Sequence, residues 1–506
     1  MRPKDFLNKQ DVVKNYEGAE AYRMSPEMEL YSAVVTSTLE NSFYEAQKDR
    51  VQRIAELVSK VDPVFVAKLA VYARREMNLR SIPLLLLVEL AKNHNGDDTL
   101  RKAVSGTVLR ADEIAELLMC YQWLNPAQGA KKLGKLSRGI QNGLKDAFNR
   151  FDEYQFAKYD RHDQAVKLRD ALFLVHPKAK DEAQQEIFDK IAGEALETPY
   201  TWETELSALG QQTFLSERAK KDAFRAKWEE LIDSGKLGYM ALLRNLRNIL
   251  EADVDREHIS DVCKVLSSPA RVRKSRQFPF RFLSAYREIA DMESMHVSDI
   301  MTALEQAMLV SADNIAGFGP ETSVLIASDV SGSMECPVSR NSSVEYYDIG
   351  LVLSMLLHHR CATVVSGIFG DRWKICNLPR TGILANTMKL RDMEGEVGYS
   401  TNGYLVIEDL IGRKQKMDKV MMFTDCQLWD SRYGDRHISA SWKKYRSMYP
   451  DARLYLFDLS GYGHAPLRLE RDGVALIAGW NDKVFDVLQA LESGSDAIKE
   501  INKIEL

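Results

Sequence analysis

Three oxygen-bearing side chains stand at alternate positions in one short segment of this sequence, at Asp329, Ser331 and Ser333. The apolar run directly before them, residues 324–327, predicts a buried strand, so the three side chains lie on the loop that leaves its carboxyl end. Gly332 allows this loop to turn tightly enough for all three to point inward. Carboxylate and hydroxyl oxygens are the ligands that Mg²⁺ prefers. The segment therefore predicts a divalent-cation site; the alternative is an aspartate and two serines that cap a helix.

The spacing of these residues resembles the metal-ion-dependent adhesion site of von Willebrand factor A domains. That resemblance implies two further ligands, which occur downstream in the expected order. Thr401 lies in the glycine-bounded loop 398–403, and Asp425 follows an apolar run that predicts a second strand. Cys426 and Gln427 come next, at positions where glycine is frequent in that family, which leaves the path of this third loop open.

The expected cofactor is Mg²⁺ or another divalent cation. The hydroxyl groups are expected to bind the ion directly, whereas the two carboxylates act partly through water. One coordination position then remains open for a carboxylate supplied by a partner. The predicted ligand set is Asp329, Ser331, Ser333, Thr401 and Asp425.

From about residue 25 to 310 the sequence predicts a succession of short helices. Each candidate combines an apolar stripe at helical spacing with capping or breaking residues at its ends, as Asp62 and Pro63 do for the helix that begins there. Such helices are typical of an α-solenoid of the HEAT type, although no strict repeat is visible. The predicted helices span residues 63–80, 84–92, 112–121, 163–175, 180–196, 217–234, 238–250, 257–267 and 297–312.

Beyond residue 320 the predicted elements alternate between strands and helices. The strands are expected at residues 324–328, 363–369, 373–378, 419–424, 453–458 and 474–478. Helices are expected at residues 346–359, 404–412, 437–448 and 483–492. This order is that of βαβ crossovers and predicts a doubly wound sheet. Open sheets of this kind bind ligands at the carboxyl ends of their strands, where the predicted cation loops lie.

The length of 506 residues exceeds what one hydrophobic core holds, so more than one domain is expected. The change of pattern predicts a helical domain over residues 1–320 and an α/β domain over residues 321–506. The longest apolar run, residues 82–88, is too short to span a bilayer. The first residues lack the apolar stretch of a signal peptide, and the six cysteines include no C-x-x-C pair. We therefore expect a cytoplasmic protein without membrane contact.

Basic residues are unevenly distributed along a chain whose net charge is −5. Between residues 51 and 150, Lys and Arg outnumber Asp and Glu by 16 to 10, and residues 271–287 contain no acid. Local basic surface on an acidic chain favours selective contact with a polyanion. The candidate contacts form three groups: Lys131, Lys132, Lys135 and Arg138; Lys158, Arg161, Lys167, Arg169, His176 and Lys178; and Arg271, Arg273, Lys274, Arg276 and Arg281.

Each basic group has a second interpretation. The first group places cations on one helical face, which suits a row of phosphates but is also common on solvated helices. In the second group, neighbouring aspartates can neutralise the cations. In the third, the cations precede Phe278, Phe280 and Phe282, and rings beside cations suit single-stranded nucleic acid, but the rings are more often core anchors. Arg244 and Arg247 can face a central opening or cap neighbouring helices.

A helical repeat region followed by a von Willebrand factor A domain resembles the Ro family, whose RNA-binding part is called the TROVE domain. Three stretches are similar to TROVE signatures: residues 151–159, residues 167–170 with His176 and Pro177, and residues 239–249. The size of the chain is similar to that of bacterial Ro proteins. The resemblance extends from about residue 25 to the end of the chain.

The resemblance implies a ring of helices, closed by the A domain, that holds single-stranded ends of misfolded or damaged noncoding RNA. It also implies that the outer surface binds a small structured RNA called Y RNA. In bacterial members, Y RNA is a tether to an exoribonuclease of the polynucleotide phosphorylase type, so that enzyme is an expected partner. The expected function is that of a ribonucleoprotein component in RNA quality control.

Catalysis by this chain is not expected. The sequence contains no G-x-x-x-x-G-K-[ST], G-x-S-x-G or H-E-x-x-H motif. Asp329 superficially resembles the aspartyl nucleophile of phosphotransferases, but their second acid would stand at Ser331. The alternative function is a cation-dependent protein–protein interaction module without RNA binding. Strong salt dependence would indicate RNA binding, whereas sensitivity to chelator would indicate docking at the metal.

Overall fold

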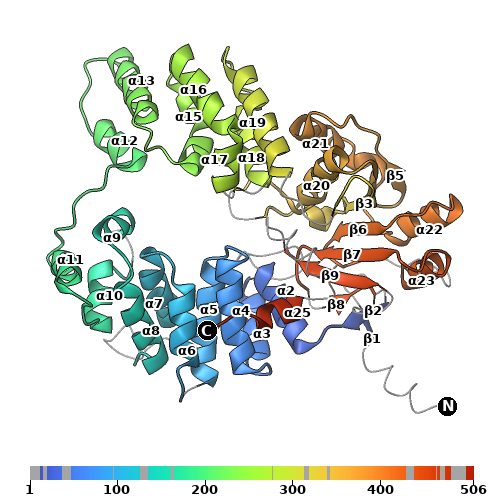
Figure 1. The fold of residues 1–506 in the computed structure, drawn as a ribbon, viewed down its shortest axis with the longest axis horizontal. Helices are drawn as coiled ribbons and strands as arrows, with labels where there is room; N and C mark the ends of the chain where they lie inside the picture. The colour runs from blue at the N-terminus through green and yellow to red at the C-terminus, as the bar shows by residue number, and fades with distance from the viewer. Residues whose placement is uncertain are drawn as a thin grey trace. The chain divides into compact units, whose positions relative to one another are not determined.

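A computed structural model shows a mostly helical region followed by an α/β region, as the sequence predicts (Figure 1). The chain divides into two compact units. The helical unit comprises residues 25–41, 45–200 and 495–506, and the mixed unit comprises residues 1–24, 42–44 and 201–494. The structure describes residues 12–14, 20–36, 47–94, 96–125, 135–160, 165–275, 277, 279–312, 318–338, 342–428, 438–462, 464–467, 473–479 and 497–506.

The helical unit is built from short helices that pack on their neighbours along the chain. They are α2 (Pro26–Val35), α3 (Gln47–Val58), α4 (Pro63–Arg75), α5 (Ser81–Asn93), α6 (Thr99–Thr107), α7 (Asp112–Leu124), α8 (Arg138–Phe148), α9 (Glu153–Tyr159), α10 (Leu168–Val175), α11 (Glu182–Ala192) and α25 (Ala497–Asn502). The helices α6 and α8 approach closely at Gly143, where a Cβ atom would lie 2.5 Å from Val104 Cβ. Glycine is therefore what lets these two helices touch.

Local hydrogen bonds set where these helices begin and end. Asp62 Oδ1 accepts from the backbone N–H groups of Val64 and Phe65, both at 3.0 Å, so α4 begins where the sequence predicts. The prediction for residues 163–175 was wrong at its start, because α10 begins only at Leu168. There the Lys167 N–H donates to Asp170 Oδ2 at 3.1 Å.

The mixed unit begins with further helices. They are α12 (Trp202–Gly210), α13 (Glu217–Asp233), α14 (Tyr239–Arg244), α15 (Leu246–Glu251), α16 (Arg256–Ser267), α17 (Pro269–Ser275), α18 (Pro279–Ala290) and α19 (Val297–Ala312). The single helix predicted over residues 238–250 is interrupted at Asn245, whose backbone leaves the helical region at φ −106° and ψ 10°. The Asn245 side chain donates to Ala241 O at 2.8 Å.

The α/β region follows within the same unit. Its strands are β3 (Ser323–Asp329), β4 (Thr363–Phe369), β5 (Trp373–Ile375), β6 (Lys419–Thr424), β7 (Arg453–Asp458) and β9 (Val474–Ala478). Its helices are η1 (Gly332–Glu335), α20 (Tyr346–Arg360), α21 (Ile383–Arg391), η2 (Glu394–Glu396), α22 (Tyr404–Gly412) and α23 (Ile438–Met448). Three short strands, β1 (Val12–Lys14), β2 (Glu20–Arg23) and β8 (His464–Ala465), pair as a separate antiparallel sheet.

The main sheet has the strand order β5-β4-β3-β6-β7-β9, and all strands except β5 run parallel. The chain moves from β3 to β4 on one side and then to β6 on the other, so the order reverses between β3 and β6. Doubly wound sheets bind their ligands at such a reversal. The predicted strand 373–378 ends early, at Ile375, α21 was not predicted, and the predicted helix 483–492 lies outside the described residues.

The helices α18 and α19 pack against α20 and α21 of the α/β region (Figure 1). Arg287 on α18 donates to both carboxylate oxygens of Asp348 on α20, at 2.6 and 2.7 Å. Asp348 is fully buried, so this ion pair is an internal link between the two regions. Among the described residues, no helix has the length and apolar character needed to cross a membrane.

Candidate metal centre and nucleic-acid interface

The five predicted metal ligands gather at the carboxyl edge of the main sheet. Asp329 is the last residue of β3, and Asp425 directly follows the neighbouring strand β6. Ser331 precedes η1 and Ser333 lies in it, while Thr401 stands in the loop before α22. All five side chains are at most 5% exposed. This is the position that the sequence predicts for the ligands, at the reversal point of the sheet.

Hydrogen bonds hold both carboxylate oxygens of Asp329. Its Oδ1 accepts from the Ser331 N–H at 2.9 Å, and its Oδ2 accepts from Thr424 Oγ1 at 2.8 Å. The hydroxyl oxygens of Ser331 and Ser333 lie 3.2 Å apart. The first loop therefore presents a carboxylate and two adjacent hydroxyls in one place, as the alternating sequence pattern predicts.

A hydrogen bond connects the loop before α22 to the loop after β6: the Thr401 hydroxyl donates to Gln427 O at 2.8 Å. The Gln427 N–H donates in turn to Asp425 Oδ1 at 3.0 Å. Asp425 Oδ2 is buried without a hydrogen-bond partner among the described residues. Cys426 adopts a left-handed backbone with φ 62°, which explains why glycine suits this position.

Ionisation of the two carboxyl groups is unfavourable in this environment. Burial raises the pKa of Asp329 to about 6. Burial, and next the charge of Asp329, raise the pKa of Asp425 to about 7. A divalent cation would reverse this effect, because it stabilises both carboxylates at once.

The orphaned Asp425 oxygen and the paired hydroxyls fit a hard cation such as Mg²⁺. Ser331, Ser333 and Thr401 would hold it directly, and Asp329 and Asp425 would act partly through water. A bound cation would supply a positive centre for a partner's carboxylate. The five residues remain predicted ligands of that ion.

A third buried carboxylate at this edge was not predicted. Asp458 ends β7, is fully buried, and contributes to the raised pKa of Asp425 after burial and Asp329. Its carboxylate accepts from the N–H groups of Ser460 and Gly461 at 3.2 and 2.7 Å. The available signal was its position as the last residue of a predicted strand whose carboxyl end meets the same edge.

The first basic group is only partly visible. Lys131 and Lys132 lie outside the described residues, whereas Lys135 and Arg138 are exposed at the start of α8. In the second group, Arg161 lies outside the described residues. Lys158, Arg169, His176 and Lys178 are exposed, and Lys167 is half-buried.

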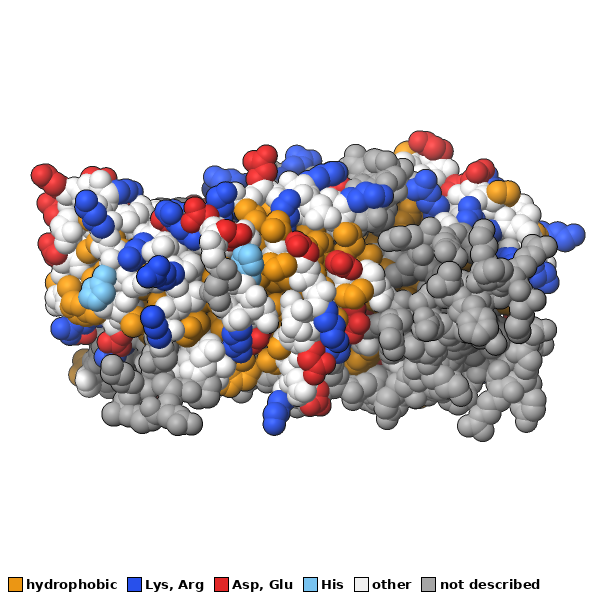
Figure 2. Space-filling model, turned by 90° about the horizontal axis from the view of Figure 1, so that it is seen from below, with side chains coloured by type: hydrophobic (Ala, Val, Ile, Leu, Met, Phe, Trp, Pro, Cys, Tyr) orange, Lys and Arg blue, Asp and Glu red, His pale blue; other side chains and the backbone are white. Residues whose placement is uncertain are grey.

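Aromatic rings accompany the second basic group. The Lys158 ammonium lies 5.8 Å from the ring centroids of Tyr154 and Tyr159. The Arg169 guanidinium lies 5.7 Å from the ring of the exposed Phe173, and it also pairs with Glu194 at 3.4 Å. Figure 2 shows one face of the molecule, on which Lys and Arg side chains are interspersed with Asp and Glu side chains. This surface is mixed in charge, with its cations partly neutralised.

The third basic group lies on α17 and α18. Arg271, Arg273, Lys274 and Arg281 are exposed, and Arg276 lies outside the described residues. Phe282 is fully buried and contacts Tyr239, so this ring is a core anchor. The side chains of Phe278 and Phe280 lie outside the described part of the chain.

Tertiary packing adds Arg244 to the third group. The helix α14 packs against both α17 and α18. The pKa of Arg281 is lowered first by partial burial of the Arg281 guanidinium and then by the charge of Arg244. Arg247 instead pairs with Glu251 at 2.8 Å. Like charges that gather on one set of packed helices favour contact with an anion.

Comparison with known proteins adds family membership to this geometry. The family model described as the TROVE domain matches residues 28–205 and 191–307, and the model described as the Ro60 vWA domain matches residues 323–492. The TROVE match alone spans more than half of the chain. Both matches agree with the observed order of a helical region and an α/β region.

Individual relatives are more distant. The chain is 26% identical over 343 residues to telomerase protein component 1 of Rattus norvegicus and of Mus musculus, covering 52% of this chain and 12% of each relative. The crystal structure of the Ro (RSR) protein of Deinococcus radiodurans superposes with a TM-score of 0.63 at 20% identity, covering 93% of this chain and all of that one. The two family matches and this shared fold show that the chain belongs to the Ro family of RNA-binding proteins, in which a TROVE domain precedes a von Willebrand factor A domain.

Proposed function

We propose that this chain binds small noncoding RNA through its helical region and holds single-stranded RNA ends on the basic surface of α14, α17 and α18. The observation that supports this most is the packing of α14 on α17 and α18, which places Arg244 on the same group of helices as the third basic group. Burial and then the charge of Arg244 lower the pKa of Arg281, an effect that an RNA phosphate would offset. Exposed Arg271, Arg273 and Lys274 extend the same positive surface along α17.

The finer parts of the proposal rest on family membership. We expect Y RNA on the second basic group, Lys158 to Lys178, where rings beside cations suit structured RNA with unpaired bases. Misfolded RNA with a free end is the expected second ligand. An exoribonuclease of the polynucleotide phosphorylase type, tethered through Y RNA in the cytoplasm, is the expected partner.

A gel-shift competition tests the RNA-binding proposal. The protein should prefer a hairpin with a 3′ single-stranded extension over the same hairpin with a blunt end. The triple variant Arg271→Ala, Arg273→Ala, Lys274→Ala should weaken binding of the extended hairpin by about tenfold or more and flatten the dependence of affinity on salt, because fewer phosphates are neutralised. A control variant removes three exposed cations of the α/β region, Lys389, Lys414 and Lys416.

The outcomes separate the two explanations of the basic surface. Equal loss of affinity in the test and control variants would mean that net charge alone attracts RNA. Equal affinity for blunt and extended hairpins would contradict the assignment of a single-stranded end. Shortening of the RNA during incubation with Mg²⁺ would contradict the expectation that the chain is not an enzyme.

A second function is favoured by the buried oxygen cluster at Asp329. A divalent cation held there would present a charge that an acidic side chain of another protein can complete. We propose that the A domain docks such a partner independently of RNA. Calorimetry should show Mg²⁺ binding to the parent protein and none to Asp329→Ala. Unchanged affinity in that variant would contradict the metal assignment.

A further inference from the structure

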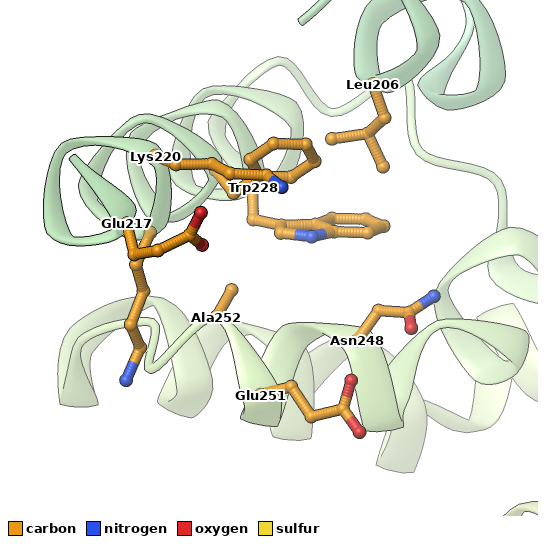
Figure 3. A pocket seen from close by; sticks show the side chains of 9 residues that line it. Leu206, Glu217, Lys220, Trp228, Asn248, Glu251 and Ala252 are labelled. Carbon is orange, nitrogen blue, oxygen red and sulfur yellow. The ribbon is translucent and has the colours of Figure 1, made fainter. Parts of the chain in front are cut away.

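A cavity of about 660 Å³ opens between α12, α13 and α15, and its lining includes none of the predicted metal ligands and none of the three basic groups (Figure 3). Its apolar wall is formed by Leu206, Phe224 and Trp228, with Ala252 below. Trp228 is 2% exposed and stacks on Trp202 with ring centroids 6.3 Å apart, so this part of the wall is held rigidly in place. Phe224 is half-buried and is the ring that a bound molecule can reach. A volume of this size suits a small organic ligand.

Polar groups at the mouth of the cavity come from two helices. Glu217, Lys220 and Lys221 lie on the α13 side, and Asn248 and Glu251 project from α15 (Figure 3). The Lys221 Nζ lies 3.6 Å from Asp253 Oδ2, so these two residues form an ion pair. Lys220 is exposed and forms no ion pair with the part of the chain that the structure describes. The α13 side therefore carries two lysines against the single carboxylate of Glu217, and Lys220 is the cation that an anion can use.

Hydrogen-bond acceptors dominate the opposite end. Asn248 donates its Nδ2 to Asn245 Oδ1 at 2.8 Å, which directs its own carbonyl oxygen to serve as an acceptor. Glu251 accepts from Arg247 Nε at 2.8 Å through one oxygen and keeps a second oxygen. A ligand that reaches this end must offer N–H groups.

We propose that this cavity binds one nucleoside monophosphate unit, either free or as an unpaired nucleotide of RNA. The base stacks on Phe224, the phosphate contacts Lys220 and Lys221, and amino groups of the base donate to Glu251 and Asn248. Guanine suits the acceptors best, because its ring N–H and adjacent amino group match a carboxylate. Uracil offers no amino group and binds least well. The RNA form of the ligand rests on the RNA-binding function proposed above.

The test uses the full-length protein and ligand-observed NMR titrations with GMP, AMP, CMP and UMP, followed by unstructured oligonucleotides. We expect GMP to bind more tightly than UMP. Lys220→Glu should weaken GMP binding by about tenfold, because a charged contact is lost and replaced by repulsion. Phe224→Ala should weaken it by a similar factor through lost stacking, about tenfold. Lys264→Glu changes an exposed lysine on α16 outside the cavity; it is the control and should bind as the parent does.

The outcomes distinguish this proposal from the RNA-binding proposal. Loss of oligonucleotide binding in Lys220→Glu but not in Lys264→Glu supports a site for RNA nucleotides, even if free GMP binds weakly. GMP binding that depends on Lys220, in a protein that shifts no RNA, supports a site for free nucleotides and contradicts RNA binding. Nucleotide binding that is unchanged by both cavity variants, or no binding of any nucleotide or oligonucleotide, overturns the proposal. If Phe224→Ala does not fold, the nucleotide affinity of Lys220→Glu, a change at the exposed rim, decides whether the cavity binds nucleotides.

Discussion

Replacing Asp425 with asparagine should stabilise the protein in the absence of metal and remove its response to Mg²⁺. The buried carboxyl group faces the charge of Asp329, and one of its oxygens has no hydrogen-bond partner among the described residues. Asparagine keeps an oxygen that can accept from the Gln427 N–H. It removes the charge, however, and adds an N–H group that can donate to neighbouring oxygens.

The magnitude follows from the pKa of Asp425, which burial and the charge of Asp329 raise from 3.8 to about 7. At 1.36 kcal/mol for each pKa unit, ionisation of Asp425 disfavours the folded state by on the order of 4 kcal/mol. The sign follows from linkage: this group stabilises the protein fully below pH 3.8, and that contribution is lost as the pH rises to about 7. Because the buried amide also carries a cost, we expect Asp425→Asn to gain about 1–3 kcal/mol at pH 8.

Thermal unfolding at pH 8, in chelator and in excess Mg²⁺, measures both effects. In chelator the variant should unfold at a higher temperature than the parent, by about 2–4 °C for each kcal/mol. In Mg²⁺ at about 100 times Kd, the parent should gain about 2.7 kcal/mol while the variant gains nothing. Asp451→Asn, which removes an exposed carboxylate from the same unit, is the control and should match the parent in both conditions.

Two results would refute this reasoning separately. A parent protein whose unfolding temperature does not respond to Mg²⁺, Mn²⁺ or chelator has no cation site at these residues. A variant that is less stable than the parent in chelator shows that Asp425 stabilises the metal-free fold. In that case, hydrogen bonds to the Asp425 carboxylate outweigh the unfavourable effect of its burial.

Contacts elsewhere in the chain give three further expectations. Gly143→Ala should lower the free energy of unfolding by about 1–3 kcal/mol in chemical denaturation, because its methyl group would meet Val104. Arg287→Met should cost about 3–5 kcal/mol by leaving Asp348 charged and buried, and adding Asp348→Asn should recover most of it. Burial alone would lower the pKa of His258, but hydrogen bonds to two aspartates raise it above 6.5. Its stabilisation is therefore present below pH 6.5 and lost as the pH rises through the folded pKa, and His258→Gln should abolish that fall in Tm.

The sheet was readable from the sequence because buried parallel strands are continuous apolar runs between turn residues. The predicted ranges 363–369, 419–424, 453–458 and 474–478 coincide with β4, β6, β7 and β9. Helix boundaries depend on single side chains, which periodicity does not reveal. The break at Asn245 is an example, since its side chain hydrogen-bonds to the backbone of the preceding turn.

The clustering of the predicted metal ligands could be foreseen to the extent that they follow strands whose ends share one edge. Asp329 and Asp425 meet because β3 and β6 are adjacent in the sheet, a consequence of the doubly wound topology. Contacts between distant elements carry no such signal. The approach of Arg244 to Arg281 and the burial of Arg287 against Asp348 depend on how helices pack, so the acid-free run 271–287 could not be divided into surface and internal cations beforehand.

A short series of contacts connects the third basic group to the loop that carries Ser331 and Ser333, because α18 contains both Arg281 and Arg287. Arg287 is bonded to Asp348 at the start of α20, and α20 packs on η1, which contains Ser333. Coupling between two sites requires an element with two alternative arrangements, not merely a chain of contacts. Arg287 also donates to Ser343 O at 2.6 Å, so we expect the buried pair to keep one arrangement.

We therefore expect RNA affinity to be independent of the cation. An unstructured oligonucleotide is the suitable probe, because its own folding does not change with Mg²⁺. Its affinity should agree within about twofold between Mg²⁺ and chelator at matched ionic strength, since salt alone changes binding through counterion release. The variant Asp329→Ala should bind it as the parent does. A loss of affinity of about tenfold in that variant would mean that α18 and α20 move together and that the A domain controls RNA affinity.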